Sequence, residues 1–127
     1  MEIEKGLKWK EEIVSDESMS AAYMGEGALD VFSTPSMIAL MEKTAWAGVQ
    51  PLLDEGYGTV GISLDVKHNA ATPIGMKVTC ESELIEVDGR KLTFRLKAYD
   101  EKEEIGECIH ERFIVKNEKF LSRVNQK

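Results

Sequence analysis

The sequence predicts a single two-layer α+β domain in which one long, largely apolar helix packs on an antiparallel sheet. Three observations lead to this prediction. Val31–Asp54 has the apolar composition of one buried helix, and the apolar segments after it alternate with the period of β-strands. Short clusters of Gly, Pro, Asn and Asp separate these segments. One helix and several antiparallel strands bury their apolar faces most simply in two layers.

Length and composition limit the class of protein. With 127 residues, the chain suits one domain with a substantial core, so we expect residues 1–127 to form a single domain. A formal net charge of −7 argues against nucleic acid or an anionic membrane as the main partner, because both need a basic face. No apolar run approaches the roughly 20 residues of a membrane span, and the N-terminus lacks an apolar signal core. We therefore expect a cytoplasmic protein with no membrane partner.

The cysteines fit the same setting. Cys80 and Cys108 lie in strand-like segments without CxxC spacing, so we expect no metal site. Both are predicted to be reduced and to pack as small apolar residues.

The first part of the chain is predicted to hold one strand and one long connection. Leu7–Val14 mixes apolar residues with Lys and Glu, which favours a short, half-exposed strand. Ser15–Asp30 is rich in small and polar residues and includes two glycines, which indicates a loop with at most a helical turn. Because this loop leads into the helix, it is either a plain connection or a cover over a site at the helix N-terminus.

The helix within Val31–Asp54 has a marked start. Pro35 suits a first helical position, and Ser33 or Thr34 can cap the free amides before it. One predicted stripe consists of Met37, Met41, Thr44, Ala45, Gly48 and Leu52, and further apolar residues on the other sides are Ile38, Leu40, Val49 and Leu53. A helix that is apolar nearly all round is expected to be buried.

Glu42 is the most informative residue of this helix. Its neighbours three and four residues away are Ile38, Ala39, Ala45 and Trp46, so its carboxylate projects from an apolar surface. A carboxylate is rarely buried without a partner. Taken alone, Glu42 is more often a residue at the edge of the apolar face that reaches solvent or a lysine; otherwise it serves a site.

The rest of the chain is predicted to form four strands of a meander. Val60, Ile62, Leu64, Val66 and His68 alternate with polar or small residues, which predicts a strand with His68 on the face that packs on the helix. Asn69–Gly75 is a turn, Met76–Val87 is a strand, and Asp88-Gly89 indicates a hairpin. The next inward face is formed by Leu92, Phe94, Leu96 and Ala98, Asp100–Glu103 is a turn, and Ile105, Ile109, Phe113 and Val115 carry the last strand. By that alternation, His110 is expected at the surface.

Three stretches resemble those of the fluoroacetyl-CoA thioesterase family: Val31–Glu42, His68–Gly75 and Glu104–Arg112. The resemblance extends from about Gly6 to the C-terminus. It implies a hotdog fold, in which a five-stranded antiparallel sheet wraps one central helix, and it implies a homodimer with sites at the subunit interface. It also implies that Thr34, Glu42 and His68 are the catalytic residues, because they match the family's threonine, glutamate and histidine at the same gaps of eight and twenty-six residues.

The expected reaction is hydrolysis of a small acyl-CoA thioester. Glu42 either attacks the thioester or activates water, and His68 transfers protons. Amides at the helix N-terminus near Ser36 or Met37 are candidates for binding the oxyanion. Arg112 is either a surface cation or a residue that helps to hold a phosphate or carboxylate, and Gly75 is a further candidate substrate contact whose simplest role is the turn. No cofactor is expected, because CoA is part of the substrate.

Helix geometry constrains this site. Eight helical residues span about 12 Å, so Thr34 and Glu42 of one straight helix do not easily touch. Either Thr34 folds back or the site uses two chains, and the implied dimer favours two chains.

Two other functions remain open. An acyl-CoA hydratase of the same fold would carry an Asp and a His at the helix entry, which Phe32–Ser36 lacks. A non-catalytic acyl-CoA-binding protein would have lost one of the three catalytic residues, and none is lost.

Overall fold

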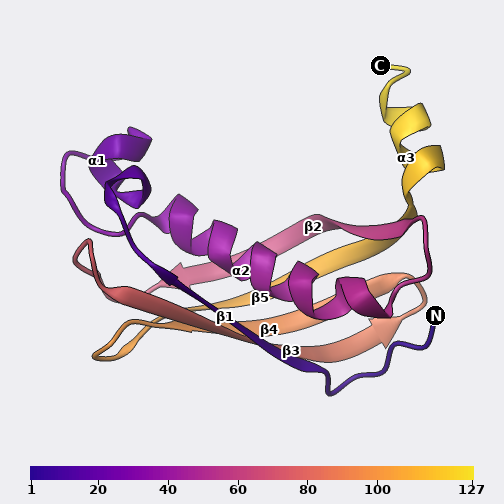
Figure 1. Cartoon of the computed structure of the whole chain (residues 1–127), viewed down its shortest axis with the longest axis horizontal. Coiled ribbons are helices and arrows are strands. Elements are labelled where there is room, and N and C mark those ends of the chain that lie inside the picture. Colours follow the sequence, from indigo (N-terminus) through magenta and orange to yellow (C-terminus); the bar gives the residue numbers. More distant parts are fainter.

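The computed structural model describes all of residues 1–127 and contains a curved five-stranded antiparallel sheet with one long helix along one face (Figure 1). The strands are β1 (Lys8–Val14), β2 (Tyr57–His68), β3 (Lys77–Asp88), β4 (Lys91–Tyr99) and β5 (Glu104–Lys116). The helices are α1 (Ala21–Met24), α2 (Thr34–Val49) and α3 (Asn117–Val124). This is the expected α+β hotdog arrangement.

The strand order in the sheet is β1-β3-β4-β5-β2. Strands β3, β4 and β5 form a meander, but β2 lies on the far side of β5, so the predicted four-strand meander is wrong. The connection from β2 to β3, which includes Asn69–Gly75, crosses the sheet instead of forming a hairpin. This crossing leaves β2 at an open edge of the sheet in the single chain.

Helix α2 begins where its sequence indicates. Ser33 is the N-cap, and its hydroxyl accepts a hydrogen bond from the amide of Ser36 at 3.1 Å. The buried residues of α2 are Met37, Leu40, Met41, Thr44, Ala45, Gly48 and Val49. Leu52 falls in a short 3₁₀ turn after the helix and is 42% exposed, so it does not extend the predicted stripe. Trp46 is 43% exposed, so the helix is not buried all round.

A bulge changes the inward face of β2. Gly61 pairs with Arg112 and Ser63 with Glu111, which leaves Ile62 as an extra residue that is 51% exposed. Beyond the bulge, Leu64, Val66 and His68 lie on the helix-facing side as predicted. Before the bulge, the residues that face the helix are those predicted to face away from it, so Gly61 instead of Val60 faces the helix.

The last strand buries the face that was predicted to be exposed. Its buried residues after Ile105 are Gly106, Cys108, His110, Arg112 and Ile114. Ile109 and Phe113 are each 39% exposed, and His110 is 0% exposed, so the prediction that His110 is a surface residue is wrong. The reason is a register break: Ala98 pairs with Gly106 but Tyr99 pairs with Glu104, so Ile105 is out of phase with the rest of β5.

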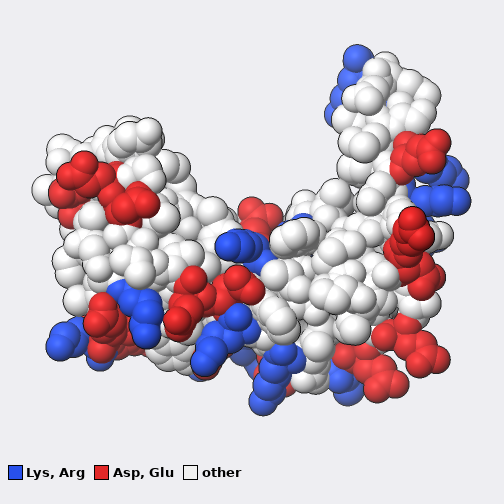
Figure 2. Space-filling model, in the orientation of Figure 1, with Lys and Arg blue, Asp and Glu red and all other residues white.

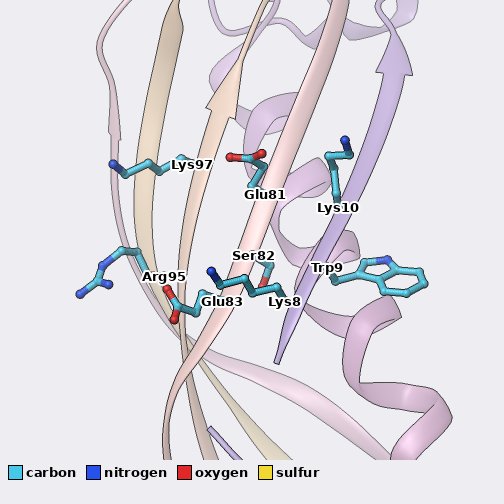
Figure 3. Close-up of a pocket in the computed structure, with 8 residues that line it drawn as sticks. All are labelled: Lys8, Trp9, Lys10, Glu81, Ser82, Glu83, Arg95 and Lys97. Carbon is cyan, nitrogen blue, oxygen red and sulfur yellow. The ribbon is translucent and has the colours of Figure 1, made fainter. Parts of the chain in front are cut away.

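The outer face of the sheet, which points away from α2, carries charges of alternating sign from strand to strand. Lys10, Glu81, Lys97, Glu107 and Lys67 are successive cross-strand neighbours over all five strands. Lys8, Glu83 and Arg95 form a parallel row beside it (Figure 3). Such rows are typical of a solvated sheet face.

Two short helices project on the helix side of the sheet. In Figure 1, α1 lies at one end of the molecule and α3, which was not predicted, rises from the other end, and Figure 2 shows the surface hollowed between these two projections. None of the helices is long and apolar enough to cross a bilayer.

Candidate active site

Thr34 and His68 come together at the start of α2. The hydroxyl of Thr34 lies 2.7 Å from Nδ1 of His68, although the two residues are 34 positions apart. Thr34 is the first residue of α2, and His68 is the last residue of β2, so the helix start and the strand end together fix this pair. The predicted placement of His68 on the helix-facing side is confirmed.

The electrostatic surroundings favour a neutral His68. Burial lowers the pKa of His68 below its usual 6.5, and the nearby carboxylate of Glu26 acts in the opposite direction. The second ring nitrogen, Nε2, is buried and has no hydrogen-bond partner within the chain. The pair borders an open cavity of about 240 Å³ whose lining also includes Glu26 and Phe32. A neutral imidazole with one unpaired nitrogen at a cavity can accept or deliver a proton.

Glu42 lies in a different cluster, halfway along the helix. Its carboxylate pairs with Nη1 of Arg112 at 3.5 Å, and the side chain of Glu42 is 40% exposed while that of Arg112 is only 8% exposed. The Arg112 guanidinium also donates from Nε to the hydroxyl of Thr59 at 2.8 Å and from Nη2 to the carbonyl of Thr59 at 3.0 Å. Arg112 is therefore a buried residue with fixed orientation and not a surface cation.

His110 is a buried hydrogen-bond partner of Arg112. Its Nδ1 lies 2.8 Å from the carbonyl oxygen of Ser63, which requires Nδ1–H to donate. Nε2 then has a free lone pair, and it accepts from Nη1 of Arg112 at 3.2 Å. Burial and the neighbouring Arg112 cation both lower the pKa of His110, which keeps the ring neutral as this hydrogen bond requires. A chain of contacts thus runs from the Ser63 backbone through His110 and Arg112 to Glu42.

The two clusters are well separated within one chain. Glu42 packs beside Gly61, whereas Thr34 contacts His68, seven residues further along the same strand. At about 3.3 Å per residue, with one residue in the bulge, this places roughly 20 Å between them. The helix gives about 12 Å for the eight residues from Thr34 to Glu42. Thr34 does not fold back toward Glu42, so a single chain brings two of the three predicted catalytic residues together and leaves the third apart.

The backbone amides of the remaining predicted substrate contacts make hydrogen bonds within the chain. The amide of Ser36 donates to the Ser33 hydroxyl and that of Met37 to the Ser33 carbonyl at 3.0 Å, so the N-cap residue engages both amides, and oxyanion binding by them stays a prediction. The Met37 side chain is fully buried. Gly75 has a φ of +99° and its amide donates to Ser15, so it serves the turn before β3.

Sequence reasoning missed His110, Thr59 and Gly61 as parts of the Glu42 cluster. The one available signal was the alternation of Cys108, His110 and Arg112 along β5. This spacing places the two polar residues, His110 and Arg112, on the same strand face as the small apolar Cys108. The bulge that turns Gly61 inward leaves no mark in the apolar pattern.

The two cysteines are free and buried. Burial raises the pKa of Cys80 to about 12 and that of Cys108 to about 11, so both thiols stay protonated and serve the core as expected.

Comparisons with known proteins agree on one family. The fluoroacetyl-CoA-specific thioesterase family matches residues 14–118. A fluoroacetyl-CoA thioesterase from Streptantibioticus cattleyicolor is 43% identical over 98 residues, which cover 77% of this chain and 70% of that protein.

Solved structures extend the likeness over the whole chain. The fluoroacetyl-CoA thioesterase FlK superposes with a TM-score of 0.93 at 34% identity, over 100% of this chain and 98% of that one. A thioesterase superfamily member from Thermus thermophilus, at 24% identity, shares the fold with a TM-score of 0.91 over 98% of this chain and 93% of that one. Both the sequence match and the fold lead to the same assignment: this chain belongs to the fluoroacetyl-CoA-specific thioesterase family.

Proposed function

We propose that this protein hydrolyses a small acyl-CoA thioester at a site shared by two chains of a homodimer. In this site, Thr34 and His68 of one chain act together with Glu42 of the other. The enzyme class, a thioester hydrolase, follows from the family. The observation that carries the proposal is the division of the three candidate residues between two clusters of one chain.

Three features support the use of two chains. The separation of roughly 12 to 20 Å is too large for direct contact between Glu42 and the Thr34–His68 pair within a chain. Nε2 of His68 is buried without a partner, which a group from a second chain would supply. Strand β2 ends the sheet with an unpaired edge and exposes Ile62 and Leu64, and a second copy with the same edge would cover both.

Hydrolysis requires water to add to the thioester carbonyl carbon and the carbon–sulfur bond to break. In the simpler of the two routes, Glu42 and neutral His68 activate the attacking water, whose proton passes to His68, and the imidazolium so formed returns a proton to the leaving thiolate. In the other route, Glu42 attacks the carbonyl itself, and water then releases the acyl group from the mixed anhydride. Thr34 orients His68 in both, because its hydroxyl is bonded to Nδ1. Neither route uses a cofactor other than the CoA of the substrate.

Arg112 holds the Glu42 carboxylate in a defined position. We infer that the same guanidinium contacts an acyl substituent bound beside Glu42. The FlK relative has been solved with acetyl-CoA in one variant and with fluoroacetate and CoA in another. By analogy, the acyl group here is short.

The deciding experiment is release of free thiol from a panel of short, branched and aromatic acyl-CoAs, including fluoroacetyl-CoA. Glu42→Gln and His68→Ala are each expected to lower turnover by orders of magnitude while circular dichroism stays unchanged. Glu55→Gln is the matched control, since this exposed residue lies after the helix. Binding of acyl-CoA without thiol release would favour the non-catalytic alternative. Water addition to an unsaturated acyl-CoA, with the thioester intact, would favour a hydratase.

A further inference from the structure

A basic site lies at the end of β5, outside the Glu42 cluster. It is a groove of about 280 Å³, here called the basic groove, between the end of β5, the β3–β4 turn and α3. Its four cations are Arg90, Lys116, Lys119 and Arg123, and the aromatic residues Phe113 and Phe120 form part of its wall. No Asp or Glu lines it. In Figure 2, Lys and Arg side chains at the base of the projecting C-terminal helix lie beside Asp and Glu side chains, none of which lines the groove.

These cations are not used by the fold. None of the four takes part in an ion pair within 4 Å, whereas other lysines of the chain, such as Lys91 and Lys97, do. The only carboxylate of α3, that of Glu118, does not line the groove. In a chain with a net charge of −7, four unpaired cations on one groove form a local reversal of the overall charge.

The outer face of the sheet carries the same number of cations in a different setting. The outer-face hollow of about 750 Å³ is larger and also has four cations, Lys8, Lys10, Arg95 and Lys97. There, however, Glu81 and Glu83 stand between the cations on the neighbouring strand, as Figure 3 shows. Each of those cations has a carboxylate opposite it, so the outer face is a charge-balanced surface. The basic groove has no such compensation.

We propose that the basic groove binds the phosphorylated adenosine end of the CoA substrate. This inference rests on the proposed function, which makes an acyl-CoA the substrate. The chemistry is complementary: the ligand end carries a diphosphate, a 3′-phosphate and a flat purine, and the groove offers four cations and two phenyl rings. Electrostatic attraction there offsets the repulsion that a −7 protein exerts on a polyanionic substrate.

The groove lies within reach of the Glu42 cluster. Arg112 contacts Glu42, and Lys116 of the groove lies four residues beyond Arg112 on the same face of β5. Four strand residues span about 13 Å. The pantetheine arm of CoA, an extended chain with two amide groups, separates thioester from diphosphate and is suited to bridge such a distance.

The test combines charge reversals with shortened substrates. The variant Arg90→Glu with Lys119→Glu changes the basic groove, and Lys5→Glu with Lys102→Glu, two exposed lysines outside the groove, is the matched control. For acetyl-CoA, the groove variant is expected to raise KM at least about tenfold with little change in kcat, because nucleotide contacts act on binding rather than on the reacting bond. The control variant is expected to leave both constants within about twofold, and circular dichroism checks folding in each.

Substrate truncation locates the effect. Acetyl-pantetheine lacks the nucleotide, so its kcat/KM is expected to be the same in the wild type and the groove variant. Acetyl-dephospho-CoA lacks the 3′-phosphate. The difference in kcat/KM between the wild type and the groove variant is therefore expected to be smaller for this substrate than for acetyl-CoA. Equal effects of the groove variant on acetyl-CoA and acetyl-pantetheine would overturn the proposal.

Direct binding separates this inference from the proposed function. Calorimetric titration with CoA and with adenosine 3′,5′-bisphosphate is expected to give at least about tenfold weaker binding to the groove variant, and the loss is expected to shrink at high salt. If the wild type binds CoA in this way but hydrolyses no thioester, the proposed function fails and the groove assignment stands. If the groove variant binds both ligands as tightly as the wild type, the groove assignment is wrong whatever the activity.

Discussion

Gly61 and Glu42 are in direct contact across the interface between β2 and α2. A methyl group on Gly61 would lie 2.7 Å from Oε2 of Glu42, closer than such atoms approach in proteins. It would also lie 3.2 Å from Cε1 of His110. The absence of a side chain at Gly61 therefore leaves the space that the Glu42 carboxylate occupies beside Arg112.

Gly61→Ala is expected to displace the Glu42 carboxylate and to lower kcat/KM for acyl-CoA about tenfold or more. Stability is expected to change little, because Gly61 is exposed in the single chain and its φ is not positive. Gly58→Ala is a matched control in the same strand, since its new methyl group would meet only the Asn117 side chain, at 2.7 Å. Equal activity of the two variants would show that the space beside Gly61 does not determine the position of Glu42.

The acid limb of the pH–rate profile is expected below pH 6.5. His68 must be neutral to take a proton, and burial lowers its pKa, so activity persists as the pH falls through 6.5 and declines only near the lowered pKa. Glu26 raises that pKa, so Glu26→Gln is expected to move the limb to still lower pH. The profile of kcat/KM for the two proteins checks this. A shift toward higher pH in Glu26→Gln would assign the limb to another group.

His110 is expected to act as a positioning residue for Glu42 through Arg112. His110→Leu removes the acceptor of the Arg112 Nη1–H and is expected to lower kcat about tenfold, with a smaller effect on KM. His110→Gln can place an amide oxygen near the position of Nε2 and is expected to recover much of kcat. A purely structural role would affect both variants according to their stability, so unfolding midpoints are measured in parallel. Full activity of the Leu variant would exclude the positioning role.

Mixed dimers test the shared site directly. Thr34→Ala and Glu42→Gln are each expected to be inactive, but a heterodimer of the two contains one site with both side chains intact. After random subunit exchange, half of the dimers are mixed and half of their sites are intact, so about a quarter of wild-type activity is expected. Co-expression with two affinity tags supplies verified heterodimers. If these are no more active than either parent, the two-chain site is wrong.

Gly106→Ala is expected to destabilise the fold. The new methyl group would lie 2.6 Å from Sδ of Met37 and 2.8 Å from the carbonyl oxygen of Lys67, which is held in β2. Because the backbone cannot yield freely, we expect a loss of about 1–3 kcal/mol in the free energy of unfolding, measured by urea titration. Gly27→Ala, with only Ala21 at 3.7 Å, is the control and is expected to stay within about 0.5 kcal/mol. Similar midpoints for both variants would contradict the expected clash.

Local rules predicted the elements that carry apolar packing. Ser33 and Pro35 marked the start of α2, and Leu92, Phe94, Leu96 and Ala98 are all buried in β4 as their alternation indicated. In these segments, burial and apolar character coincide, so the periodic pattern and the fold agree.

The same rules failed where polar residues are buried. In β5, His110 and Arg112 take the inner face while Ile109 and Phe113 point outward, so the apolar period indicated the wrong side. In β2, the bulge at Ile62 depends on pairing with a strand some fifty residues away, which no local pattern reports. The apolar pattern singled out Glu42 and His68, and the family resemblance added Thr34 and the catalytic roles. The division of the three residues between two clusters required the three-dimensional arrangement.

The outer face of the sheet also bears on how the strands find their neighbours. Lys8 and Lys10 make β1 positive, Glu81 and Glu83 make β3 negative, and Arg95 and Lys97 make β4 positive on this face. Placing β1 against β4 during folding would therefore set like charges opposite one another, whereas the native place of β1 beside β3 sets unlike charges together. Each pair contributes only about 0.2–1 kcal/mol. Together they discriminate against a mispaired sheet even though all of these side chains lie on its solvent-facing side.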